Sequence, residues 1–237
     1  MTVVLLALLA FQTPVDEGTL VVREDTVEVA REAFRVTAVR TGAGGTRWTI
    51  ATTIRYDRTR PVVVLDPIVE LGADSNPVSL EYTVADPREP MRILGQLTRG
   101  RFVVRLLGRR TERAREFPAP PPAAVVDDSV FALYLPVAWQ GRPRPVTVTA
   151  VFPRAGRREL LTVQDLGVQS TTLNRDPAAL QHITVTGGEN RLVHLWLGAD
   201  GRLAKIEVPS RRLVAERRPH PEVRFVASRN LPRARRV

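Results

Sequence analysis

Residues 46–57, TRWTIATTIRYD, alternate apolar and polar side chains with a period of two. Trp48, Ile50, Ile54 and Tyr56 fall on one face of this stretch, while arginine and threonine side chains occupy the other. A period of two is that of a β-strand with one buried and one solvated face, which is typical of antiparallel rather than parallel sheets. The stretch therefore predicts an antiparallel sheet.

The same alternation recurs along the chain, in residues 78–84, 101–106 and 146–152. Sequences typical of turns separate the alternating segments. Asp200-Gly201, between two apolar runs, is the clearest of them, because this dipeptide is typical of the type I′ turn of a two-residue hairpin. We therefore expect a mainly all-β chain, folded as a large curled antiparallel sheet, an open barrel or a β-roll.

Two places in the sequence predict irregular strands. The apolar positions change parity between Val27 and Phe34, so a β-bulge near residues 30–33 would return both to one face and bend the strand. Pro67 interrupts another apolar segment, and because proline has no N–H to donate, it predicts a sheet edge or a break there.

One segment has a different pattern. The proline-rich run 118–122 predicts a stiff spacer, and residues 127–129, Asp-Asp-Ser, are types preferred at helix N-caps. The apolar residues that follow have helical spacing, and Pro136 should end or kink the helix. We therefore expect one short helix around residues 128–135, with a strand as the alternative.

This helix would divide the domain into two sheet sections, residues 19–117 and 144–216, and would serve as a lid, a plug or a connector. The chain has 237 residues, and β sandwiches and barrels of this size occur as one unit. The expected organisation is a signal peptide and leader in residues 1–18, a single antiparallel β domain in 19–216, and an Arg- and Pro-rich mobile tail in 217–237.

The N-terminus favours export. Residues 3–11, VVLLALLAF, form an unbroken apolar run that matches the core of a signal peptide and is too short to cross a bilayer, which takes about 20 residues. No basic residue precedes the run. Two alternatives therefore stay open: the start codon is placed too late and omits a basic leader, or the run is a buried first strand. Since no later segment is long and apolar enough for a transmembrane span, we expect a periplasmic or secreted protein.

The charge balance is strongly basic, with a formal net charge of +10 at pH 7 and Lys205 as the only lysine. Much of the excess lies in residues 217–237. Aromatic residues make up only 5% of the chain, which argues against the stacking platforms of nucleic-acid binding. A solvated surface, or contact with an acidic partner of the cell envelope, explains the charge better.

The sequence offers little catalytic chemistry. It has no cysteine, which excludes disulfides, thiolate zinc sites and cysteine nucleophiles, and it has no nucleophile elbow, P-loop or dinucleotide motif. The three histidines are too scattered for a metal site, and we expect His182 and His194 to form a cross-strand pair. The prediction is a non-enzymatic protein with no catalytic residue, no metal and no cofactor.

Aromatic side chains of inward parity are the best candidates for a binding surface. They form either a plain hydrophobic core or the lining of a cavity or groove for a lipid-like or other apolar ligand. The expected ligand-binding residues on this concave face are Trp48, Tyr56, Tyr82, Phe102 and Trp196.

Three stretches resemble a group of exported bacterial domains of unknown function. Residues 27–34, VEVAREAF, are similar to an x-V-G-x-E-x-F strand, with Ala30 in place of the glycine. The second stretch, in the middle of the chain, is residues 127–131, DDSVF. The third, residues 195–209, LWLGADGRLAKIEVP, is similar to a terminal W-x-x-x-D-G-R-L-x-x-x-x-x-P hairpin. The resemblance covers about residues 19–216 and implies a curled antiparallel sheet, loosely similar in shape to the periplasmic lipoprotein carriers. It carries over no catalytic residue.

Two classes of function follow. The first is a non-enzymatic exported envelope protein that binds a lipid-like or other apolar ligand on a concave sheet. The alternative is a structural or interaction module that uses a basic surface to contact an acidic envelope partner. Nucleic acid is not an expected partner.

Overall fold

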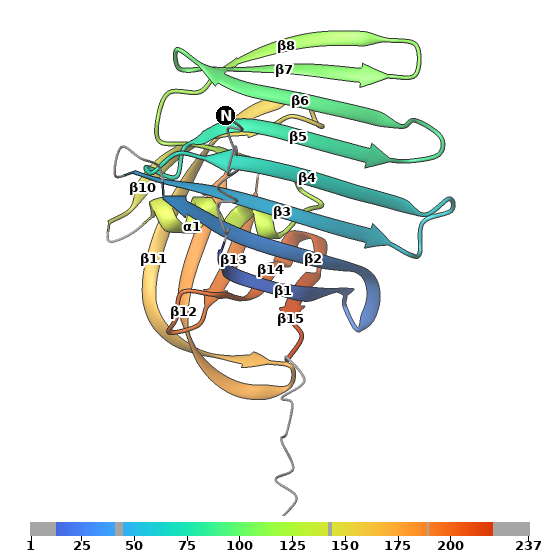
Figure 1. Cartoon of the computed structure of the whole chain (residues 1–237). Helices are drawn as coiled ribbons and strands as arrows, with labels where there is room; N and C mark the ends of the chain where they lie inside the picture. The colour runs from blue at the N-terminus through green and yellow to red at the C-terminus, as the bar shows by residue number, and fades with distance from the viewer. Residues whose placement is uncertain (1–12, 41–44, 142–143, 189, 220–237) are drawn as a thin grey trace, which may run out of the picture.

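In a computed structural model of the protein, residues 13–40, 45–141, 144–188 and 190–219 are described. Their strands form one sheet of 15 strands, in the order β8-β7-β6-β5-β4-β3-β2-β1-β15-β14-β13-β12-β11-β10-β9 (Figure 1). Neighbouring strands pair antiparallel everywhere except between β9 and β10, which are parallel. The predicted mainly all-β class with a large antiparallel sheet is confirmed.

The first eight strands follow the chain from the middle of the sheet to one edge. Their burial alternates as the period-two patterns predict, and β3 buries Ile50, Thr52 and Ile54 on one face. The edge strand β8 exposes its arginine and glutamate side chains, which disfavours pairing with the edge of another molecule. The bounds are β1 Thr13–Glu24, β2 Val27–Arg40, β3 Thr46–Tyr56, β4 Val63–Leu71, β5 Pro77–Ala85, β6 Met91–Thr98, β7 Arg101–Gly108 and β8 Glu112–Pro118.

The remaining strands run from the other edge back to the middle. The longest of them, β11, has a bulge between Asp165 and Val168, where Gly167 has a φ of +76°. The bounds are β9 Ala123–Val125, β10 Val146–Phe152, β11 Arg157–Leu173, β12 Asp176–Gly187, β13 Arg191–Leu197, β14 Leu203–Val208 and β15 Leu213–Arg217.

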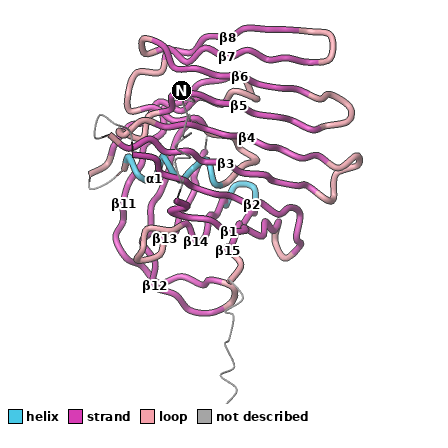
Figure 2. Tube along the Cα trace, in the orientation of Figure 1, coloured by secondary structure: helices cyan, strands magenta, loops and turns pink. Residues whose placement is uncertain are grey.

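The first and last strands meet in the middle of the sheet, where β1 pairs with β2 on one side and with β15 on the other. As a result β2 to β8 form one wall and β10 to β14 form a second wall, with the short helix α1 (Leu135–Gln140) between them (Figures 1 and 2). Buried side chains of both walls and of the helical segment belong to a single hydrophobic core. The sheet is curled around this core.

A buried ion pair fixes the junction of β1 and β15. The Arg217 guanidinium donates to the Asp16 carboxylate across 2.7 Å and to the Leu203 carbonyl across 3.0 Å. It also lies 5.4 Å from the centre of the Phe34 ring. The Asp16 carboxylate is almost fully buried, so Arg217 supplies the charge that this burial requires.

The junction extends the domain beyond its predicted limits. β1 begins at Thr13, although residues 13–18 were assigned to the leader, and Arg217, assigned to the tail, ends β15. The polar residues of early β1 looked like a segment outside the fold because the partner of Asp16 lies at the far end of the chain. The predicted signal-peptide core, residues 3–11, and residues 220–237 of the predicted tail lie outside the described residues.

The segment between β8 and β10 passes through the inside of the curled sheet. We call residues 123–140 the plug. All of residues 123–138 are buried except Asp128 and Ser129. Of the three roles expected for this segment, the structure favours the plug.

The helical part of the plug begins later than the sequence predicts. A 3-10 turn, η1 (Ala132–Tyr134), leads into α1, and neither has a side-chain cap. The prediction of a helix around 128–135 capped by residues 127–129 was therefore wrong in its limits, because these side chains bind arginines instead. Pro136 lies in the first turn of α1, where its missing N–H would have no helical partner, rather than at the helix end.

The predicted hairpin at Asp200-Gly201 joins β13 and β14, but its turn is of another kind. Only Gly201 has a positive φ, of +77°. The Gly201 N–H donates to the Gly198 carbonyl across 2.9 Å, and the Gly198 N–H donates to the Arg202 carbonyl. A longer loop of this kind needs one left-handed residue rather than the two of a type I′ turn.

The two predicted irregularities are present in altered form. The β1–β2 register shifts between Glu28 and Ala30, so the bulge in β2 lies slightly before the expected position. β4 is not an edge strand, but its pairing with β3 skips Asp66 and Pro67 while the pairing with β5 continues. The break is local and lies where proline has no N–H to donate.

No helix in the described ranges has the length and apolar character needed to span a membrane.

We expect Arg217→Ala to lower the free energy of unfolding by about 3 kcal/mol, because it leaves the buried Asp16 carboxylate without its cationic partner, with only the Leu203 N–H still donating to it. Urea denaturation measures the change. The matched control is Arg218→Ala, since Arg218 is exposed and should matter by less than about 0.5 kcal/mol. Equal effects of the two substitutions would contradict the role of the buried pair.

Candidate functional site

The plug covers the concave face of the sheet with its own apolar side chains. Phe131, Leu133 and Leu135 are among the largest fully buried side chains of the described residues. They belong to the same core as side chains of both walls. The plug therefore lies where an apolar ligand of a curled sheet would lie, and its attachment to the sheet is the candidate functional site.

Glu32 of β2 makes the first attachment. Its carboxylate is fully buried and accepts hydrogen bonds from the Thr52 hydroxyl at 2.8 Å and from the backbone N–H groups of Phe131 at 2.8 Å and Ala132 at 2.9 Å. Burial raises the pKa of Glu32 to about 7, and the three hydrogen bonds act in the opposite direction. One acid thus holds the start of the 3-10 turn against the sheet.

Asp127 makes the second attachment. The Arg154 guanidinium binds its two carboxylate oxygens at 2.8 and 2.7 Å, in the bidentate geometry typical of arginine. The Tyr82 hydroxyl donates to the same carboxylate across 3.1 Å, and the Ser129 N–H donates across 2.8 Å. Burial and the Asp127 charge raise the pKa of Tyr82, so this hydroxyl keeps its proton.

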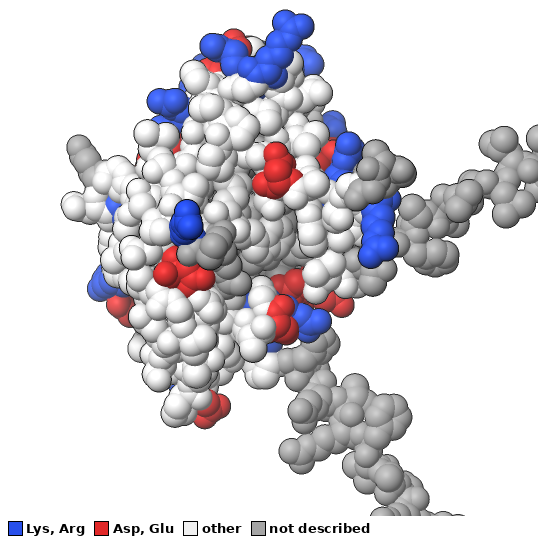
Figure 3. Space-filling view, turned by 90° about the vertical axis from the view of Figure 1, so that its left-hand side faces the viewer, with Lys and Arg blue, Asp and Glu red and all other residues white. Residues whose placement is uncertain are grey.

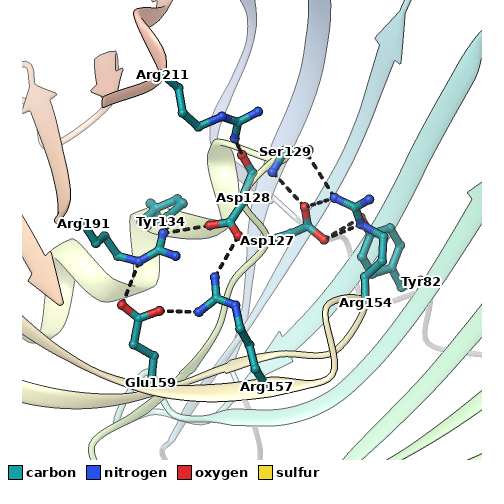
Figure 4. Close-up of polar contacts among 10 residues, drawn as sticks. All are labelled: Tyr82, Asp127, Asp128, Ser129, Tyr134, Arg154, Arg157, Glu159, Arg191 and Arg211. Carbon is teal, nitrogen blue, oxygen red and sulfur yellow. Dashed lines mark hydrogen bonds and ion pairs between the residues drawn. The ribbon is translucent and has the colours of Figure 1, made fainter. Parts of the chain in front are cut away.

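Asp128 makes the third attachment, shown in Figure 4. Its carboxylate accepts from Arg191 at 2.7 Å and from Arg157 at 2.8 Å. Both arginines also pair with Glu159, so the two acids and two arginines form a closed ring. Burial opposes the charge of Asp128, but the hydrogen bonds and charges of Arg191 and Arg157 hold its pKa below the usual range.

Two further hydrogen bonds hold the plug beside this ring. Arg191 donates to the Tyr134 hydroxyl across 3.0 Å, and Arg211 donates to the backbone carbonyl of Asp128. The Arg157 and Arg191 guanidinium groups lie 3.8 and 4.8 Å from the centre of the Phe152 ring, within the range of cation–π attraction.

A cavity of about 350 Å³ adjoins these contacts. It lies between the plug, the β12–β13 turn and the residues that follow β14. Its lining combines charged, polar and apolar groups, from Asp128, Ser129, Phe131, Tyr134, Asn190, Arg191, Leu192, Val208, Ser210 and Arg211.

Four of the five expected ligand-binding residues contribute to the core that the plug completes. The Tyr56 hydroxyl donates to the Ser129 carbonyl across 2.7 Å, and Tyr82 binds Asp127. The ring of Trp48 lies 5.5 Å from that of Trp139 in α1. Phe102 is fully buried in the same core. Three of these residues contact the plug directly, and a ligand role for the four stays a prediction.

Trp196 does not share this face. It packs with Leu180 and Ala204 in a separate small cluster. The two neighbours of Trp196 in β13, Leu195 and Leu197, point into the main core instead. Because the run 192–197 has apolar residues of both parities, parity alone could not decide which side faces inward. The expectation that Trp196 lines the concave face is therefore corrected.

The face that carries Trp196 also holds the predicted cross-strand histidine pair. His182 Nε2 lies 2.8 Å from His194 Nδ1, and the His182 ring stacks on Trp196 at 3.9 Å. The Lys205 ammonium pairs with Glu207 at 2.7 Å and donates to the Thr172 carbonyl at 2.9 Å. These contacts fasten the end of the β11–β12 hairpin over this face.

No three His, Asp or Glu side chains of the described residues are grouped so that they could hold a metal ion. Several of the described arginines pair with acids, in surface pairs such as Arg92 with Glu81 and Arg105 with Glu112. Figure 3 shows one face of the molecule, where acidic side chains lie among the basic ones and most of the surface is uncharged. The basic side chains of the described residues seen in this view form no continuous patch.

The arginines that hold the plug were not predicted as site residues, and neither was Glu32. Glu32 carried a signal, since its parity in residues 27–34 places it inward beside Phe34. Nothing in the sequence distinguishes the arginines that hold the plug from the many other arginines of this chain.

No family model matches the chain, and no curated protein matches it in sequence. Among solved structures, it is similar to the crystal structure of a β-barrel-like protein of the domain of unknown function DUF1849 from Brucella abortus. The two are 13% identical, the match covers 85% of this chain and 92% of that chain, and the TM-score is 0.45. At this level of similarity no site residue or activity carries over.

We expect Glu32→Gln to change how stability depends on pH. In the wild type the unfolded chain releases the Glu32 proton near pH 4.5, whereas the folded chain keeps it up to about pH 7. The free energy of unfolding of the wild type therefore falls as pH rises through the window from about 4.5 to about 7, by up to about 3 kcal/mol relative to that of Glu32→Gln. Above about pH 7 the difference between the two proteins is constant. Urea denaturation across the window measures it.

Thr52→Val is the control, because it removes one donor but keeps the carboxylate. It should retain the loss of stability with rising pH. Parallel curves for the wild type and Glu32→Gln would show that Glu32 does not titrate in this window.

Proposed function

We propose that the chain is a non-enzymatic, exported envelope protein that binds a lipid-like or other apolar ligand on the concave face of its sheet. The plug occupies this face in the free protein, and the ligand replaces the apolar side chains of the plug when it binds. Export to the periplasm or the exterior is supported by the apolar run 3–11.

One observation carries this proposal: a separate segment, rather than the large side chains of the sheet alone, fills the concave face. Phe131, Leu133 and Leu135 are buried there between the two walls. An apolar ligand in their place would gain the same kind of burial, worth about 25 cal/mol per Å². The face is therefore suited to an exchange between plug and ligand.

The attachment of the plug is compatible with release. The backbone hydrogen bonds of the plug to neighbouring strands come from β9 and the adjoining Val126. The ion pairs of Asp127 and Asp128 involve arginines that are partly exposed. Such pairs contribute a modest net free energy, because desolvation offsets much of their attraction. Water can replace them when the plug moves.

The absence of catalysis is part of the proposal. Asp127 and Asp128 are bound by arginines. Glu32 has a raised pKa but is fully buried, where the Thr52 hydroxyl and two backbone N–H groups of the plug occupy its carboxylate. The close histidine pair, His182 and His194, lies on the other face, where His182 also contacts Gln169 at 2.7 Å. Burial and the charge of His194 lower the pKa of His182, and no described serine or threonine hydroxyl bonds to either ring.

We expect weaker anchoring of the plug to strengthen ligand binding. Asp127→Asn removes the bidentate pair with Arg154 and should raise the affinity for the fluorescent apolar probe N-phenyl-1-naphthylamine about tenfold, because more molecules have a free concave face. Arg154→Gln should do the same from the other side of the pair. Fluorescence titration measures the affinity, and circular dichroism verifies folding.

Glu81→Gln is the matched control. It removes the exposed pair of Glu81 with Arg92 on the outside of the sheet and should leave the affinity unchanged. If the probe binds none of these proteins, the proposed function is wrong. If the probe binds the wild type and all three variants with equal affinity, the ligand does not use the face that the plug covers.

A further inference from the structure

The cavity beside the plug has an uneven charge. Three charged side chains line it, namely Asp128, Arg191 and Arg211, so its lining carries one positive charge in excess. Asp128 is already bound by two arginines, and Arg191 is bound to two acids. The excess charge is therefore that of Arg211.

Arg211 has no carboxylate partner among the described residues. Its hydrogen bond goes to the backbone carbonyl of Asp128, a neutral acceptor that one guanidinium nitrogen can serve. A guanidinium has five N–H donors and binds carboxylate or phosphate oxygens in pairs. The next residue, Arg212, differs, because it pairs with Asp25 at 3.0 Å and lies outside this cavity.

The rest of the lining suits a molecule with one polar end. The hydroxyl of Ser210 and the side-chain amide of Asn190 add hydrogen-bonding groups beside the arginine. Leu192 and Val208 add apolar surface, and Phe131 leads from the cavity into the core of the plug. Polar and apolar groups thus meet at the point where the plug enters the concave face.

We infer that this cavity binds the anionic head group, a carboxylate or phosphate, of an amphipathic ligand whose apolar tail occupies the concave face. The inference rests on the proposed function and names the chemical class of its ligand. Arg211 is the residue that recognises the head group. Because Arg211 also holds the Asp128 carbonyl, an anion that takes this guanidinium also removes one attachment of the plug.

The test compares probes that share a ten-carbon tail. We expect isothermal titration calorimetry to show that the wild type binds decanoate and decyl phosphate about tenfold more tightly than decanol. Arg211→Gln should bring the anionic probes to the affinity of decanol. Arg212→Gln, the neighbouring control, should keep the tenfold preference, and Arg211→Lys should keep much of it.

The outcomes separate the two claims. Equal binding of decanol and decanoate by the wild type would overturn the head-group site and leave the proposed function standing. Failure of all three ten-carbon probes to bind would overturn both. Inorganic phosphate and acetate test whether the cavity binds a free anion. If inorganic phosphate binds as tightly as decyl phosphate, the apolar tail contributes nothing to binding and the inference is wrong. Unchanged thermal unfolding of Arg211→Gln would confirm that the exposed side chain can be replaced without loss of the fold.

Discussion

A curled sheet has to cover the apolar side chains of its concave face, and the rest of this structure depends on how that is done. Here residues 123–140 enter the space between the two walls and complete one core with them. Polar groups inside a core must be paired. Backbone N–H groups of the plug donate to Glu32 of the sheet, and the plug's own Asp127 and Asp128 pair with arginines. The plug is therefore both core and polar attachment, and each part requires the other.

Features that depend on local chemistry could be predicted from the sequence. Alternation in residues 46–57 reported which side chains of β3 are buried, because side-chain direction in a strand follows from position alone. Gly201 marked the β13–β14 hairpin, since it takes a left-handed conformation without strain. The plug was expected as one of three roles because proline-rich residues 118–122 and helical spacing interrupted the alternation.

Features that depend on distant partners could not be predicted. Glu32 and Phe131 are 99 residues apart, and nothing in their neighbourhoods indicates that they meet. Asp127 and Asp128 were interpreted as helix caps because capping is a local role for these residues, whereas arginines from β11, β13 and the loops decide their actual role. Trp196 was placed inward because its strand has apolar residues on both faces, and the β11–β12 hairpin covers the second face.

Exchange of the plug for a ligand is measured most directly by hydrogen exchange at the backbone N–H groups of Phe131 and Ala132. Both donate to the buried Glu32 carboxylate in the free protein, so they should exchange slowly there. If a bound decanoate or decanol displaces the plug, saturation with it should speed the exchange of these two groups while amides of the central strands stay protected. Unchanged or slower exchange at Phe131 and Ala132 in the ligand-saturated protein would contradict the displacement of the plug.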